Sequence, residues 1–345
     1  MKQTFLFCLF ALLLAFALPL LLSSPAAAPR AVAAERETAA PVTEAQVTAS
    51  GIAVPAETGD FSADAGTLLS VRTADGVTET TMAEYLPLAL AGEMPASFSV
   101  EALKAQAVAL RTYALYYRAQ PKTVHPDAAV CTNAGCCCAA ANPAALRDAW
   151  GARYDEDWQK LCAAVQATDG QYLRYDDAPA LTVFHASSAV CTEDGSALGV
   201  GLRYLVSVAT PETSDLVTGL TTTVEVSPEE FRTAIRSVAP DAALDGSPDT
   251  WLGRTNLSAS GRVASMEIGG QTVTGLTLRQ LFSLRSTDFT LTAEADGSLR
   301  FRVRGYGHGL GMSQYGADLL ARDGADCAAI LSHYYPGTVL ARVTE

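Results

Sequence analysis

Glu93 is the side chain in this sequence best placed to act as a general acid. It lies between Gly92 and Met94-Pro95 in a stretch of largely apolar residues. A poorly solvated carboxyl group keeps its proton to a higher pH, as a general acid must. A lone Glu is more often an exposed surface residue, so this interpretation depends on the rest of the chain.

A long helix is predicted to follow Glu93. Leu103, Ala107 and Leu110 recur at spacings of three and four, which is typical of a buried helix face. Pro95 interrupts the helical pattern ahead of this helix, so Glu93 is predicted to lie at a helix junction. The helix would provide a rigid platform behind the site.

Thiols and one imidazole crowd into a second segment. His125 is followed by Cys131, Cys136 and Cys137, with Cys138 as a rival for the last position. Adjacent cysteines seldom pair with each other, whereas thiolates and an imidazole in one loop are ligands of tetrahedral zinc. We expect a structural zinc ion, because four protein ligands leave no position for water. A disulfide-bonded or redox-active cluster, or simple reduced thiols, is the alternative.

Four stretches resemble the family of the stage II sporulation protein D, a cell-wall glycan hydrolase of endospore-forming bacteria. They follow the order of the family at similar intervals and are residues 84–117, 184–194 with 203–212, 261–291 and 305–321. The resemblance covers roughly residues 68–343. It implies a lytic transglycosylase that cuts peptidoglycan strands during engulfment, with Glu93 as its catalytic glutamate. The implied partners are peptide-free glycan strands, a cell-wall amidase and engulfment proteins.

One carboxylate suffices for such an enzyme. Ordinary glycosidases use two carboxyl groups, but here the C6 hydroxyl of N-acetylmuramic acid attacks its own anomeric carbon and leaves a 1,6-anhydro sugar. Glu93 would donate a proton and then accept one. Glu193 is the best second acidic residue. The alternatives are a non-catalytic, glycan-binding amidase enhancer, and a metallohydrolase with an open ligand position in the zinc loop.

Two further segments are predicted to contact substrate. His185, Ser187 and Ser188 follow a strand-like run, where a strand would hold polar groups still. Residues 305–317, GYGHGLGMSQYGA, lack the Gly-Lys-Ser ending of a phosphate loop. Their glycines allow close approach of the backbone, and tyrosine rings stack on sugars. The family resemblance places this segment beside the catalytic glutamate, so the candidate contacts there are Tyr306, His308, Gln314 and Tyr315.

The resemblance also extends to the metal. Some family members bind zinc through a His, a Cys, a second His and a Cys at the same intervals. Cys136 stands where the second His would be, which gives one His and three Cys. Such a set is still a competent structural zinc site.

The composition and the first residues indicate which partners and which cellular location to expect. A formal net charge of −13 argues against nucleic-acid binding. The length of the apolar run 5–22 is intermediate between that of a cleaved signal peptide and that of a membrane-spanning helix. Because the family usually keeps a membrane anchor, we expect an anchor. Cleavage near Ala26 and Ala28, giving a secreted protein, is the alternative. Either way the body is expected outside the cytoplasm.

The predicted fold is mixed α+β. Residues 1–25 are the anchor or signal, 26–66 a flexible tether that builds no core, and 67–345 the catalytic domain, with a zinc loop at 125–138 and a β-rich lobe at about 215–300. Strands are predicted at 68–72, 77–81, 172–175, 181–184, 204–208, 221–226, 263–268, 289–293 and 299–304. Later helices are predicted at 228–238, 275–282, 312–321 and 327–334.

Overall fold

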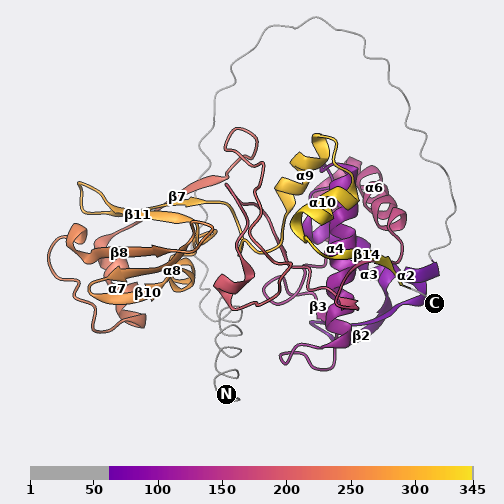
Figure 1. The fold of residues 1–345 in the computed structure, drawn as a ribbon, viewed down its shortest axis with the longest axis horizontal. Coiled ribbons are helices and arrows are strands. Elements are labelled where there is room, and N and C mark those ends of the chain that lie inside the picture. The colour runs from indigo at the N-terminus through magenta and orange to yellow at the C-terminus, as the bar shows by residue number, and fades with distance from the viewer. Residues whose placement is uncertain (1–61, 344–345) are drawn as a thin grey trace, which may run out of the picture.

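The computed structural model describes residues 62–343, and its architecture is mixed α+β, as predicted. The apolar run 5–22 and almost all of the predicted tether lie outside these residues. Within the described part, no helix has the length and apolar character needed to span a bilayer. Figure 1 shows two parts, a body that contains both ends of the described chain and a lobe built from its middle.

The body is organised around α4 (Val100–Ala119), the long helix predicted after Glu93. Its centre is buried on nearly every side, because α3, α6, α9, α10 and β4 all pack against it. The hairpin β1–β2 closes at Asp75-Gly76 as predicted, and β3 joins β1 in parallel. The other elements of the body are α2 (Ser62–Gly66), β1 (Leu68–Thr73), β2 (Gly76–Thr81), α3 (Met82–Glu93), β3 (Val130–Cys131), α5 (Pro143–Trp150), η2 (Gly151–Arg153), α6 (Tyr154–Ala167), β4 (Gln171–Tyr175), β5 (Ala178–Pro179), β6 (Phe184–His185), η3 (Gly195–Leu198), β13 (Met312–Ser313), α9 (Gln314–Arg322), α10 (Cys327–Tyr334) and β14 (Val339–Arg342).

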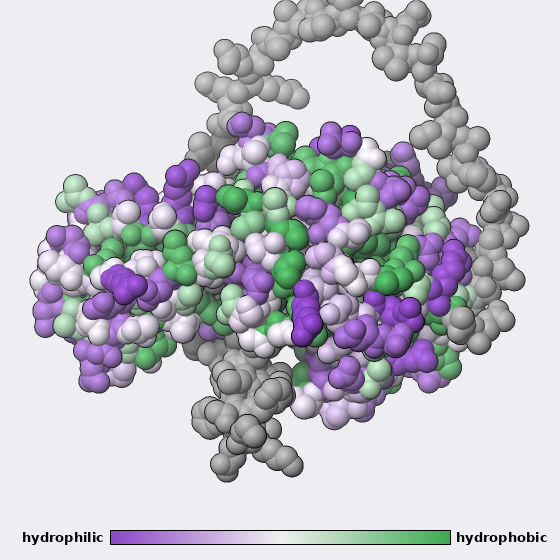
Figure 2. Space-filling model, in the orientation of Figure 1, coloured by the Kyte–Doolittle hydropathy of each residue, from purple (hydrophilic) through white to green (hydrophobic). Residues whose placement is uncertain are grey.

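The lobe has a hydrophobic core separate from that of the body. Two three-stranded sheets, in the orders β10-β9-β8 and β11-β12-β7, enclose stacked aromatic rings; the rings of Phe231 and Phe282 have centroids 5.2 Å apart. On the face seen in Figure 2, hydrophobic and hydrophilic residues are intermixed over both lobe and body. The elements of the lobe are β7 (Thr221–Val226), α7 (Pro228–Val238), η4 (Pro248–Trp251), β8 (Leu252–Leu257), β9 (Val263–Ile268), β10 (Gln271–Thr274), α8 (Gly275–Leu281), β11 (Phe289–Ala293) and β12 (Leu299–Arg304).

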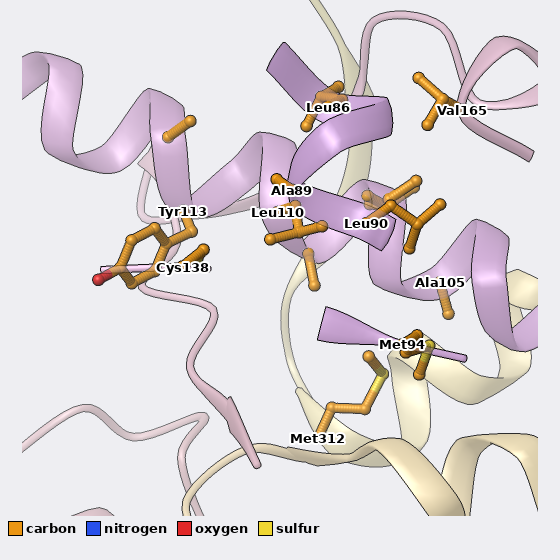
Figure 3. Close-up of a cluster of buried hydrophobic side chains, with 14 of the residues drawn as sticks. Leu86, Ala89, Leu90, Met94, Ala105, Leu110, Tyr113, Cys138, Val165 and Met312 are labelled. Atoms are coloured by element: carbon orange, nitrogen blue, oxygen red, sulfur yellow. The ribbon is translucent and has the colours of Figure 1, made fainter. Parts of the chain in front are cut away.

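The core of the body extends to the end of α3. Figure 3 shows Met94 close to Met312 and Cys138 close to Tyr113. All four are buried. Met94 directly follows Glu93, so its packing against Met312 of β13 helps to fix the backbone that carries the Glu93 carboxyl group (Figure 3).

Several secondary-structure elements were predicted wrongly from the sequence. Residues 204–208 form no strand, and of the predicted strand 181–184 only Phe184 is extended in β6. Their apolar residues are explained by burial of an irregular segment: Tyr204 is 2% exposed, and its hydroxyl accepts a hydrogen bond from the Leu181 N–H at 2.6 Å. The helix predicted from Met312 starts at Gln314 instead, because residues 312–313 pair with β6 as β13.

The end of the predicted tether is also corrected. Residues 62–66 form α2, and Asp64 is buried in a two-pronged ion pair with Arg111 of α4, at 2.7 Å to Nε and 2.6 Å to Nη2. The composition of this segment, rich in Ala, Ser and Gly, did not predict the ion pair, because the pair depends on a partner 47 residues away. Removing one member of a buried ion pair leaves an uncompensated charge, so the start of the body is firmly tied to α4.

Candidate functional site

Glu93 is the last residue of α3, at the helix junction that the sequence predicted. A capping box formed by Thr81 and Glu84 begins this helix, and the extended backbone of Met94 ends it. The carboxylate is half-buried, and its Oε1 accepts a hydrogen bond from the backbone N–H of Ala139 at 2.6 Å. Burial raises the pKa of Glu93 above its ordinary value, although the hydrogen bond from Ala139 and the nearby side chain of Gln314 oppose the shift. Glu93 therefore has the electrostatic character of a proton donor.

Gln314 lies against Glu93 at the start of α9. It is 7% exposed, and its side chain lies close enough to the Glu93 carboxyl group to lower the pKa of that group. Within residues 62–343 its Nε2 has no hydrogen-bond partner. The neighbouring Tyr315 packs edge-on against Phe98, with ring centroids 5.0 Å apart. The glycine-rich segment thus reaches the candidate acid, and Gln314 has a donor available for a ligand there.

His185 belongs to a buried hydrogen-bonded chain. Its Nδ1 lies 3.1 Å from the carbonyl oxygen of Leu310, so this nitrogen must carry the proton. Its Nε2 lies 2.6 Å from the hydroxyl of Ser188, which in turn accepts from Nη2 of Arg262 at 2.8 Å. Burial lowers the pKa of His185 well below its ordinary value, so the imidazole is neutral. The chain of contacts ties β6 to the glycine-rich segment and to the lobe.

Two glycines allow that segment to pack tightly on β6. A Cβ at Gly311 would lie 1.9 Å from the carbonyl oxygen of Val183, and one at Gly307 would lie 2.6 Å from the Cβ of His185. Both have positive φ, of 65° and 115°. Any larger residue at these positions would push the segment away from the strand.

The predicted substrate contacts differ in their exposure. Tyr306 is 51% exposed, and its backbone pairs with Ser187 through hydrogen bonds of 2.8 and 3.1 Å. His308 is half-buried, and burial, followed by the charges of Arg279 and Arg262, lowers its pKa to about 4. Ser187, Ser188 and His185 are all buried. Tyr306 presents the largest surface, and the assignment of all these residues to substrate stays a prediction.

Glu193, the alternative acidic residue, joins the lobe to the body. It is 3% exposed and accepts hydrogen bonds from the hydroxyls of Ser258 at 2.8 Å and Ser260 at 2.7 Å. Both serines lie in the lobe, between β8 and β9. These contacts occupy its two carboxylate oxygens and give Glu193 a structural task.

Glu212 is a buried carboxylate that the sequence did not single out. Its Oε1 accepts from the backbone N–H of Ser188 at 2.9 Å and from the hydroxyl of Ser313, while Oε2 has no partner within residues 62–343. Burial raises the pKa of Glu212. No local pattern marks this residue, because its partners come from two distant segments. It holds β6 and β13 in register.

Replacing Glu212 with Gln should remove a loss of stability that the wild type suffers as pH rises. The folded protein holds this proton more tightly than the unfolded chain, so the free energy of unfolding falls as pH rises from the ordinary pKa of 4.5 through the raised one. Gln keeps the acceptor oxygen and cannot ionise. Urea unfolding of both proteins from about pH 4 to about pH 8 measures the difference. The prediction is contradicted if the free energy of unfolding of the wild type, minus that of the variant, does not decline as pH rises. Glu79→Gln, at an exposed position, is the control.

The four predicted metal ligands come together in one cluster. One ligand atom from each of His125, Cys131, Cys136 and Cys137 lies within 4.8 Å of the others. His125 Nε2 is 3.3 Å from Cys137 Sγ, which is 3.9 Å from Cys136 Sγ. The edges of a tetrahedron with zinc bond lengths of about 2.0–2.3 Å are about 3.5–3.8 Å long. The spacing therefore fits a tetrahedral ion.

The surroundings of the cluster also suit a metal. His125 Nδ1 lies 3.0 Å from the Ala128 carbonyl oxygen, which leaves the lone pair of Nε2 free for a metal. Hydrogen bonds from Cys131 and then Cys136 hold the pKa of Cys137 far below its ordinary value. The ammonium group of Lys122 donates to the Cys136 carbonyl oxygen and to the Tyr113 hydroxyl, so a positive charge sits beside the thiols.

Cys138, the rival ligand, is absent from the cluster. Its side chain is 2% exposed and belongs to the hydrophobic core of the body. Burial raises the pKa of its thiol well above the ordinary value, with a further contribution from Glu93. The geometry of the described residues thus selects Cys137 over Cys138.

The loop that carries the predicted metal ligands continues directly into the contacts that hold Glu93. Beyond Cys138, the N–H of Ala139 binds the Glu93 carboxylate, and the N–H of Ala141 donates to Leu88 of α3 at 2.9 Å. A Cβ at Gly92 would lie 2.5 Å from the Ala139 carbonyl oxygen. Gly92 therefore lets the loop lie against the last turn of α3, and the conformation of the loop sets the position of the candidate acid.

Comparison with known proteins places the chain in a family. The family model described as Stage II sporulation protein (SpoIID) matches residues 71–175, which include Glu93 and the four predicted metal ligands. The chain is 32% identical over 271 residues to Stage II sporulation protein D of Bacillus subtilis (strain 168), covering 77% of this chain and 76% of that protein. Its identity to the protein of that name from Bacillus amyloliquefaciens is 30% over 258 residues, covering 74% and 72%.

A more distant relative carries a different name. The Amidase enhancer of Bacillus subtilis (strain 168) is 26% identical over 297 residues, which cover 72% of this chain and 39% of that protein. The fold, site and matches together define a sporulation protein. The chain belongs to the stage II sporulation protein D family.

Proposed function

We propose that this protein is a lytic transglycosylase that cleaves the bond between N-acetylmuramic acid and N-acetylglucosamine in peptidoglycan strands. The supporting observation is a half-buried carboxyl group, Glu93, with a raised pKa and with Gln314 of the glycine-rich segment beside it. The pKa of Glu93 is raised by burial and not by a neighbouring carboxylate. A site with one carboxyl group suits a reaction in which the substrate supplies its own nucleophile.

Glu93 would act twice in this reaction. Its proton passes to the bridging oxygen as the bond from that oxygen to C1 of the muramic acid breaks. The C6 hydroxyl of the same sugar then bonds to C1 and gives its proton to the Glu93 carboxylate. The acid is restored, and the products are a free 4-hydroxyl and a 1,6-anhydro end.

The metal cluster supports a structural role. We propose that His125, Cys131, Cys136 and Cys137 hold one zinc ion, which would fasten the loop whose continuation binds Glu93. Four protein ligands fill a tetrahedral site, and this favours structural zinc over a metallohydrolase centre. Three thiolates with one imidazole give the loaded site one surplus negative charge, which the ammonium group of Lys122 offsets.

We also propose the setting that the family resemblance implied. The body would work outside the cytoplasm, tethered by the apolar run 5–22 or secreted after its cleavage, and alongside a cell-wall amidase. A second function is supported by the relative named Amidase enhancer. In that case the domain would bind glycan without cutting it.

One product analysis separates these functions. Full-length protein would be incubated with peptide-free glycan strands, and the strand ends identified by mass spectrometry. We expect 1,6-anhydro-muramic ends, formed without added metal and in proportion to enzyme. New reducing ends that vanish with a chelator would indicate a metallohydrolase instead, and binding without any new ends would indicate an amidase enhancer.

A further inference from the structure

Three arginines of the lobe gather against the glycine-rich segment of this acidic chain. Arg262 immediately precedes β9, Arg279 lies in α8, and Arg285 follows α8. Arg262 lies beneath Gly309, since a Cβ there would approach its guanidinium carbon to 2.7 Å. The guanidinium carbon of Arg285 lies 5.1 Å from the centre of the Tyr306 ring. Neither Glu93 chemistry nor the metal loop accounts for this concentration of positive charge.

Arg262 is a buried cation without a counter-ion. It is 2% exposed, and its one hydrogen bond from the guanidinium goes to the neutral hydroxyl of Ser188. Its Nε and Nη1 have no partner among the described residues, and no carboxylate there lies within ion-pair distance. An unpaired buried charge costs several kcal/mol. A protein that retains one concentrates positive potential at that place.

The nearest carboxylates are already engaged. Asp288 and Glu193 both act on Arg262 at longer range. Asp288, however, forms an ion pair of 2.8 Å with Arg304, and Glu193 accepts from two serine hydroxyls. Arg304 therefore compensates the charge of Asp288, while the oxygens of Glu193 are occupied by serine hydroxyls and form no ion pair with Arg262, so the guanidinium of Arg262 still lacks a contacting counter-ion.

The group of three arginines reaches solvent beside an aromatic side chain. Tyr306 is 51% exposed, Arg285 is exposed, and Arg279 is half-buried with its Nε on the Leu284 carbonyl oxygen at 3.3 Å. No carboxylate of residues 62–343 forms an ion pair with Arg279 or Arg285. Burial, followed by the charges of Arg279 and Arg262, lowers the pKa of His308, so that imidazole is neutral and adds no charge of its own. The surface thus offers guanidinium donors beside a ring that stacks on a sugar face.

We propose that Tyr306, Arg279 and Arg285, with Arg262 behind them, form a subsite for a sugar-borne carboxylate. The ligand would be the free lactyl carboxylate of N-acetylmuramic acid, which peptide-free strands expose and which an amide bond removes when the peptide is attached. The inference rests on the proposed action on glycan strands. The same segment continues from Tyr306 to Gln314 at Glu93, so a strand bound at one end of it can reach the acid at the other.

Binding of two matched strands tests this subsite without turnover. Full-length Glu93→Gln protein would be titrated with fluorescent peptide-free strands and with the same strands after conversion of each lactyl carboxylate to its N-methylamide. We expect the acid form to bind about tenfold or more tightly, which corresponds to one charge-assisted contact. Adding Arg279→Gln should bring the ratio close to one, and Arg279→Lys should retain part of it. The exposed Arg302→Gln of β12 is the control that keeps the ratio.

The outcomes separate the subsite from the wider function. Equal binding of both strands by Glu93→Gln protein that keeps all three arginines overturns the subsite and leaves the transglycosylase proposal standing. Failure to bind either strand overturns the proposed function and the subsite with it. A preference that survives Arg279→Gln together with Arg285→Gln also overturns the assignment to these residues.

Discussion

Glu93→Gln is expected to lower the rate of glycan cleavage by about 10²- to 10⁴-fold, the usual contribution of a general acid. Gln has nearly the same shape and keeps an oxygen for the Ala139 N–H, so the fold and the loop contact should survive. It has no proton to give to the bridging oxygen. The rate of formation of 1,6-anhydro ends measures the effect, and the affinity for glycan strands should change little.

Glu79→Gln is the matched control, because Glu79 is an exposed carboxylate on β2 without a role in the site. Wild-type activity should also fall as pH rises through the raised pKa of Glu93, since only the protonated form can donate. A Glu93→Gln protein that folds, binds glycan and still cuts at the wild-type rate would exclude the proposed role of Glu93.

The elements with strong local signals were predicted well. The junction at Glu93 follows from Pro95, and α4 follows from apolar residues at spacings of three and four. Strands β7, β9, β11 and β12 alternate or carry β-branched residues, and their bounds agree with the sequence-based ranges. In these segments local propensity and burial favour the same conformation.

The wrong predictions at residues 204–208 and at Asp64 have a common physical origin, which is packing against distant segments. In residues 204–208, Tyr204 and Leu205 fill the core of the body as part of an irregular segment, and their apolar character alone does not distinguish that from a buried strand. Helices α5 and α6, between the cysteine cluster and β4, were not predicted. Asp64 of α2 is fixed by an ion pair with a distant arginine rather than by any local pattern.

The candidate site was predicted residue by residue but not as an arrangement. The sequence identified Glu93, Gln314 and the four metal ligands by type and spacing or by family resemblance. It gave no sign that Ala139 would bind Glu93 across 46 residues, or that Arg262 would bind Ser188 across 74. Such contacts depend on tertiary packing, which brings together groups whose own neighbours in sequence are ordinary.

The vicinal thiols Cys137 and Cys138 give the sharpest test of the metal proposal. Cys137→Ala is expected to reduce zinc content from about one ion per chain to near zero, because a structural site needs all four ligands. Cys138→Ala should keep the ion and lose only about 1 kcal/mol of stability through a small core cavity. Metal analysis of both proteins, purified without added zinc, measures the difference. Zinc retained by Cys137→Ala and lost by Cys138→Ala would reverse the assignment, and no zinc in the wild type would remove it.

Loss of the ion should also loosen the loop that holds Glu93. Two backbone amides of the segment 137–141 hold it against α3, since Ala139 donates to the Glu93 carboxylate and Ala141 to the Leu88 carbonyl oxygen. We expect their hydrogen exchange to accelerate in Cys137→Ala while exchange in the lobe stays unchanged, because the lobe has its own core. Cleavage should decline in parallel, since a displaced Ala139 no longer orients the carboxyl group. Unchanged exchange at 137–141 in a zinc-free protein would show that the loop holds Glu93 without the metal.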